Sequence, residues 1–142
     1  MIQYPLHFSV SGQASSGMGS PWDTSVPSGK LTAAIPPEFN GPGGGYSPED
    51  FFALAAINCF IATFKVIAEK SKLQFESLSA DGRLTVDRND SGVPMMKFFS
   101  VKATIQGVTD RERALRLLEK TSQSCLVMNS IKTEKTFEFL VN

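Results

Sequence analysis

The sequence predicts an α+β domain with antiparallel sheet, and three observations indicate this class. Apolar and polar residues alternate with a two-residue period near the N-terminus, in the middle and at the C-terminus of the chain, which is typical of half-buried strands. Phe51–Phe64 is apolar almost throughout and reads as a helix. A second helical stretch, near Ala114–Leu118, has a single apolar stripe. The resulting order β-β-α-β-β-α-β favours antiparallel pairing.

The first strand is expected at Ile2–Val10. Pro5 cannot donate a hydrogen bond to a neighbouring strand, so this strand is expected at a sheet edge. Ser11–Gly29 is rich in Gly, Ser and Pro, which is the composition of a loop, and Lys30–Ile35 is expected to return as the second strand. The glycines of Asn40–Gly45 permit a close approach to another stretch of backbone.

The strongest helix start in the chain follows at Ser47. Ser47 is a good N-cap, and the missing N–H of Pro48 costs nothing at the first helical position. Glu49 and Asp50 place negative charge at the positive end of the helix dipole. We expect this helix to continue to about Ser71. A small domain has little to enclose so apolar a helix, so we expect it to be buried against a second copy of the chain in a symmetric homodimer.

The rest of the chain is expected to form strands and one more helix. Thr109 and Glu112 have the spacing of a capping box, so the second helix should begin there and cover a sheet face. A turn is expected at Asn89–Gly92. The strand-like stretches are Leu73–Leu78, Arg83–Asp87, Phe99–Gln106 and Lys135–Val141.

Composition favours one soluble domain over residues 1–142. The hydrophobic content is 42%, the charged content is 20%, and no long low-complexity linker divides the chain. Acidic and basic residues number 14 each, so we expect neither a nucleic acid nor a membrane surface as partner. Met1–Val10 lacks the basic and apolar regions of a secretory signal, and Phe51–Phe64 is shorter than the ~20 residues of a membrane span. We therefore expect a cytoplasmic protein.

Two cysteines, Cys59 and Cys125, carry the candidate chemistry. A reducing compartment disfavours a structural disulfide, and His7 is the only histidine, so we expect no zinc site, no other metal and no cofactor. Inert packing and redox chemistry both remain open from the residues alone.

The two cysteine segments resemble a known family. SPEDFFALAAINCF, which reaches Cys59, resembles the helix start of the OsmC/Ohr family, the osmotically inducible and organic hydroperoxide resistance proteins. SCLVMNSI, which contains Cys125, resembles the family's second segment, Cys-Pro-x-Ser-Asn-Ser-Leu. The resemblance implies an OsmC-like fold in which antiparallel sheets lie around long central helices of an intertwined homodimer.

The resemblance also implies a thiol-dependent reduction of organic or inorganic hydroperoxides. Cys59 matches the thiolate that attacks the peroxide and becomes a sulfenic acid. Cys125 matches the cysteine that resolves it to a disulfide, which a dithiol reductant then opens. Glu49 matches an acidic residue that holds an arginine close to the reactive sulfur.

The sequence departs from the family pattern at two places. Met1–Asn40, where the family's arginine lies, contains no arginine, and Leu126 replaces the proline after the second cysteine. Because burial of Cys59 should raise its pKa, a cation is expected near the sulfur, and Lys30 or a later arginine is the candidate. Glu49 and Cys59 are separated by about 15 Å of helix rise, so Glu49 is expected to serve the partner subunit's Cys59.

Two other functions stay open. An OsmC-fold protein without efficient peroxidase activity could bind a small apolar ligand at the dimer interface. Slow formation of the Cys59–Cys125 disulfide could instead act as a redox sensor.

Overall fold

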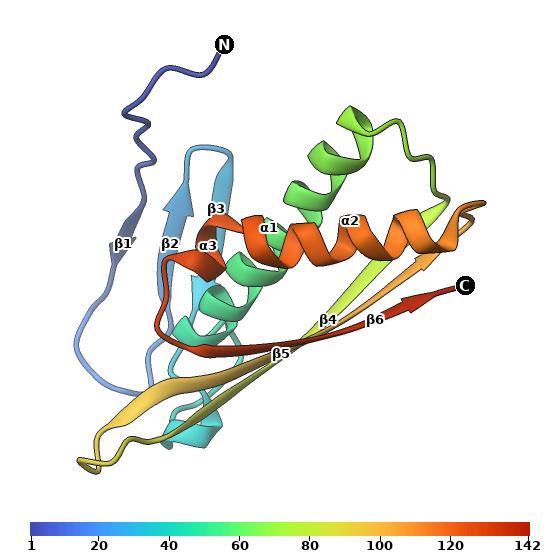
Figure 1. Ribbon diagram of the computed structural model, residues 1–142. Coiled ribbons are helices and arrows are strands. Elements are labelled where there is room, and N and C mark those ends of the chain that lie inside the picture. Colours follow the sequence, from blue (N-terminus) through green and yellow to red (C-terminus); the bar gives the residue numbers. More distant parts are fainter. The chain divides into compact units, whose positions relative to one another are not determined.

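The computed structural model describes all residues, 1–142, and Figure 1 shows its elements. The chain forms two compact units, which we call the N-terminal unit (Met1–Phe51) and the C-terminal unit (Phe52–Asn142). Helix α1 (Pro48–Lys70) begins in the first and continues through the second.

The N-terminal unit contains a small antiparallel sheet of three strands. These are β1 (Ser11–Gln13), β2 (Trp22–Val26) and β3 (Gly29–Ala33), in that spatial order, followed by a short 3-10 helix, Pro37–Phe39. The predicted second strand is confirmed, but Ser11–Gly29 is not simply a loop, because it holds β1 and β2. Val26 pairs with Gly29 across a two-residue turn, so a tight hairpin lies within a stretch whose composition is that of a loop.

The prediction of a strand at Ile2–Val10 is wrong for the single chain. No strand is formed there, and the apolar side chains of this stretch are exposed. Its alternation is that of a strand, but the chain offers it no partner strand.

The glycine-rich stretch before α1 does bring two segments together, as predicted. The N–H of Tyr46 donates to the carbonyl of Thr32 at 2.9 Å, and the N–H of Ala34 donates to the carbonyl of Tyr46 at 3.0 Å. A Cβ on Gly45 would lie 2.9 Å from that Thr32 carbonyl oxygen, so this approach requires glycine.

Helix α1 begins as the sequence predicts. The side chain of Ser47 accepts from the N–H of Asp50 at 3.0 Å, and the side chain of Asp50 accepts from the N–H of Ser47 at 3.0 Å. This reciprocal cap satisfies two main-chain donors at the helix start.

The middle of α1 has two different faces. One stripe, spaced by four residues, is buried and consists of Ala56, Phe60, Phe64 and Ala68. Another stripe includes Leu54 and Val66, which are 45% and 52% exposed in a single chain. By length and composition α1 passes the test for a membrane-spanning helix, a test that core helices of soluble proteins also pass.

The C-terminal unit is built on a second sheet of three strands. β4 (Ser77–Arg88) pairs antiparallel with β5 (Pro94–Gln106), and β5 pairs parallel with β6 (Glu134–Val141). This sheet is therefore mixed, which corrects the prediction of purely antiparallel sheet. The parallel pair arises because α2 (Arg111–Ser124) and α3 (Leu126–Asn129) carry the chain from the end of β5 back to its start.

Helices α1 and α2 lie on the same side of this sheet, as Figure 1 shows. Phe60 of α1 stacks on Phe137 and Phe139 of β6, with ring centroids 6.0 and 6.2 Å apart. Asp110 caps α2 by accepting from the N–H of Arg113, so the predicted cap at Thr109 is wrong by one residue. The two layers form the core, and the α+β class is confirmed.

Candidate functional site

The structure brings the two cysteines together in the C-terminal unit. Cys59 lies roughly three turns into α1, next to the buried stripe, and its side chain is half-buried. Cys125 lies at the junction where α2 ends and α3 begins, and it is completely buried. Both are free thiols, and the Cys125 thiol is near enough to hydrogen-bond the Cys59 sulfur.

Neutral hydrogen-bonding groups surround the Cys59 sulfur. The main-chain N–H of Val127 donates to Cys59 Sγ at 3.5 Å. The Oγ1 atom of Thr63, one helical turn further along α1, lies 3.9 Å from the same sulfur. These are ordinary distances for contacts to sulfur, and they come from two separate elements, α1 and α3.

These contacts control the ionisation of Cys59. Burial is the largest single influence and raises the pKa, because it removes water from the thiolate. The N–H of Val127, the Cys125 thiol, the Thr63 hydroxyl and the N–H of Leu126 lower the pKa, and together they outweigh burial. The pKa of Cys59 therefore lies below its ordinary value, which corrects the expectation that burial would dominate.

Cys125 is shifted in the opposite direction. The pKa of the Cys125 thiol is raised to about 11, chiefly by burial and in addition by the hydrogen bond and the charge of the neighbouring Cys59. This environment therefore favours the thiolate form more at Cys59 than at Cys125. Two groups of one type whose pKa values are pushed apart are suited to two different chemical roles.

The cations proposed from the sequence are not part of this cluster. Among the groups of the C-terminal unit that shift the pKa of Cys59, none carries a positive charge. Arg83 stands exposed on β4, and Lys30 stands exposed on β3 of the other unit. The prediction of a lysine or arginine beside the sulfur stays without support from a single chain.

Glu49 lies in the first turn of α1, in the N-terminal unit. Its Oε1 atom is buried and accepts no hydrogen bond. A buried carboxylate oxygen without a donor is unfavourable, so this oxygen is available to a donor that one chain does not supply.

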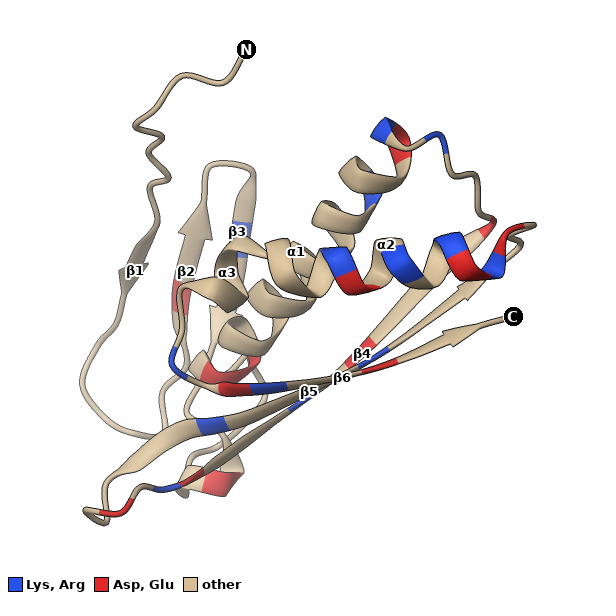
Figure 2. Cartoon of the chain, viewed as in Figure 1, with Lys and Arg blue, Asp and Glu red and all other residues tan.

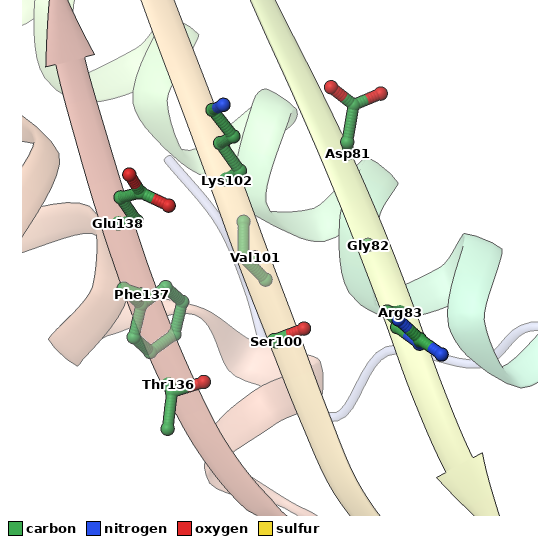
Figure 3. Close-up of a pocket in the computed structure, with 9 residues that line it drawn as sticks. All are labelled: Asp81, Gly82, Arg83, Ser100, Val101, Lys102, Thr136, Phe137 and Glu138. Carbon is green, nitrogen blue, oxygen red and sulfur yellow. The ribbon is translucent and has the colours of Figure 1, made fainter.

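A hollow lies on the exposed face of the β4–β5–β6 sheet, and neither cysteine is among its lining residues (Figure 3). It has a volume of about 430 Å³. Asp81, Lys102 and Glu138 stand side by side across its three strands, with Arg83 nearby. The charges alternate in sign and neither cysteine lines the hollow, so the cysteine pair is the better candidate site.

Thr63 and Val127 were not anticipated from the sequence. Thr63 could have been found, because a hydroxyl four residues after Cys59 lies on the same helix face. The contact of Val127 with Cys59 depends on how α3 packs beside α1, and no local sequence pattern predicts it.

Comparison with known proteins places this chain in a family. Residues 41–139 match the family described as OsmC-like protein. An uncharacterized protein of Bacillus subtilis (strain 168), YmaD, is 26% identical over 113 residues, which is 75% of each chain.

Solved structures agree over nearly the whole chain. An OsmC-like protein of unknown function from Vibrio cholerae, VCA0330, has a TM-score of 0.86 at 16% identity, covering 96% of this chain and 100% of that one. The organic hydroperoxide resistance protein OsmC from Legionella pneumophila has a TM-score of 0.77 at 22% identity, covering 99% of both chains. The chain belongs to the OsmC-like protein family.

Proposed function

We propose that the protein reduces hydroperoxides with its cysteine pair. The observation that carries the proposal is the pairing of a half-buried Cys59, whose pKa is lowered, with a buried Cys125, whose pKa is raised. Membership of a family with organic hydroperoxide resistance proteins among its relatives supports the same chemistry.

In the first step, the Cys59 thiolate attacks the terminal oxygen of a hydroperoxide, ROOH. An S–O bond forms and the O–O bond breaks, so the sulfur is oxidised by two electrons and the peroxide is reduced. The alkoxide that leaves takes up a proton equivalent to the one that Cys59 released. The products are a Cys59 sulfenic acid and the alcohol ROH, or water if the substrate is hydrogen peroxide.

In the second step, the Cys125 sulfur attacks the sulfenic acid. An S–S bond forms, the S–O bond breaks, and the hydroxide that leaves takes the proton of Cys125 to become water. A dithiol reductant then restores both thiols by exchange and is itself oxidised to a disulfide. The high pKa of Cys125 keeps it protonated, and therefore unreactive toward peroxide, until Cys59 has been oxidised.

A homodimer would complete this site. The exposed apolar side chains Leu54 and Val66 of α1 favour a second copy as their cover, and the buried Glu49 oxygen lacks a donor within its own chain. We propose that Glu49 of each chain acts at the site of the other, as a positioning residue for a donor near Cys59.

Trapping the sulfenic acid tests the reaction. Cys125→Ser protein is treated with one equivalent of cumene hydroperoxide in the presence of dimedone, which labels sulfenic acids, and is mapped by mass spectrometry. One label per chain on Cys59, with one cumyl alcohol released, supports the proposal. Protein that stays unlabelled at Cys59 while the peroxide persists would leave the ligand-binding function as the better account.

A further inference from the structure

The Cys59 sulfur occupies an uncharged setting within its own chain. Phe51–Phe64 of α1 contains no charged residue, and neither does α3 (Leu126–Asn129), as the uncoloured stretches of Figure 2 show. The titratable group that faces Cys59 from the junction of α2 and α3 is the Cys125 thiol. A thiolate here must be stabilised by dipoles and hydrogen-bond donors.

Two such donors are in place. The N–H of Val127 points at Cys59 Sγ from 3.5 Å, and it belongs to the segment that directly follows Cys125. The Thr63 hydroxyl, 3.9 Å from Sγ, can rotate to donate its proton when the sulfur is charged. Fixed donors in a half-buried site stabilise an anion more strongly than the same donors would in water.

We propose that Thr63 is a positioning residue for the peroxide chemistry, and that its hydroxyl and the Val127 N–H together hold the Cys59 thiolate in place of a cation. This inference rests on the proposed function and adds a residue to it. It also explains how the chain can dispense with an arginine in Met1–Asn40.

Substitution of Leu126 tests a further main-chain donor to Cys59, the N–H of residue 126. Residue 126 is the first residue of α3, and Cys125 before it is extended, with φ −69° and ψ 115°. Both conditions suit a proline at position 126, where it would remove one N–H beside Cys59 without disturbing the helix start. Leu126 is 74% exposed, so its side chain contributes little packing.

The test measures alkylation of Cys59 by iodoacetamide as a function of pH, in the Cys125→Ser background so that one thiol reacts. Thr63→Val should slow alkylation at pH 7 about threefold to tenfold and move the profile to higher pH, because one hydrogen bond to the thiolate is lost. Thr63→Ser, which keeps the hydroxyl, should react like the parent.

The second pair of variants tests the main-chain N–H of residue 126. Leu126→Pro should slow alkylation in the same direction, whereas Leu126→Ala, which keeps the N–H, should not. Equal rates for the Thr63→Val and Thr63→Ser variants would overturn the proposal, since a cation brought by a second copy would then dominate. Because no peroxide is used, this result is independent of whether the protein reduces hydroperoxides.

Discussion

At the scale of single residues, the account depends on two cysteines that share a site but differ in environment. Cys59 is half-buried and accepts a main-chain N–H, whereas Cys125 is enclosed at a helix junction. The same desolvation acts on both sulfurs, but only Cys59 has enough donors to outweigh it. From this difference we propose that Cys59 attacks the peroxide and that Cys125 resolves the product.

The two thiols should therefore be alkylated over different pH ranges. In the wild-type protein, iodoacetamide should modify Cys59 at lower pH than an ordinary cysteine, because its lowered pKa supplies more thiolate there. Cys125 should become reactive only as the pH approaches its pKa of about 11. Peptide mapping after brief labelling at several pH values measures this order.

Two variants control that experiment. Cys59→Ser should leave a chain that labels slowly at neutral pH, and Cys125→Ser should leave one that labels quickly. Faster labelling of Cys125 than of Cys59 at pH 7 would contradict the assignment of roles.

The parts of the site that the sequence predicts are the local ones. Ser47, Pro48 and Asp50 mark the start of α1 because capping depends on residues within one turn. The motifs around Cys59 and Cys125 predict that the sulfurs meet. The donors of Val127 and Leu126 could not be predicted, because they depend on tertiary packing between elements distant in sequence.

At the scale of elements, the position of Cys59 depends on how closely α1 approaches the sheet. Gly82 of β4 faces α1, and a Cβ at this position would lie 2.8 Å from Ile57 side-chain atoms and 2.6 Å from the Phe99 ring. Ile57 precedes Cys59 by two residues, so this glycine sets the distance between helix and strand next to the site.

Replacement of Gly82 by alanine should lower the free energy of unfolding. The new methyl group would force Ile57 and Phe99 to shift, and overpacking of this kind costs about 1–3 kcal/mol. Gly29→Ala is the matched control, because a Cβ there meets nothing within 4 Å. Urea denaturation at one fixed protein concentration measures both, and equal stability of the two variants would contradict the packing described for α1.

The sequence predicts a strand less completely where its neighbour in the sheet is distant in the chain. The alternation of Phe137, Phe139 and Val141 correctly predicts β6 and its buried face. It does not reveal that β6 runs parallel to β5, because that direction is set by the crossover through α2. The same limit applies to Ile2–Val10, whose strand-like pattern has no partner within one chain.

At the scale of the whole molecule, a single chain leaves too much apolar surface uncovered. Leu54, Ala62 and Val66 of α1 are exposed, and so are the apolar side chains of Ile2–Val10, while the buried Oε1 atom of Glu49 has no hydrogen-bond donor. Association of two copies would bury apolar surface of this kind and supply donors.

A charge placed on the exposed face of α1 should weaken that association. Val66→Arg introduces an unpaired cation into an apolar contact, so the variant should sediment as a monomer at concentrations where the wild-type protein is a dimer. Gln123→Arg, on the exposed surface of α2, adds the same charge and should remain a dimer. A wild-type protein that is monomeric at micromolar concentration would contradict the dimer.

The rate at which thiols disappear tests the central claim most directly. Reduced wild-type protein is mixed with a small excess of cumene hydroperoxide or hydrogen peroxide, quenched at intervals, and titrated for free thiols. The account predicts rapid loss of both thiols of each chain, with Cys59 and Cys125 joined in one disulfide that a dithiol reopens. Thiols that survive for minutes would contradict it, and a slow loss would favour a redox sensor over an enzyme.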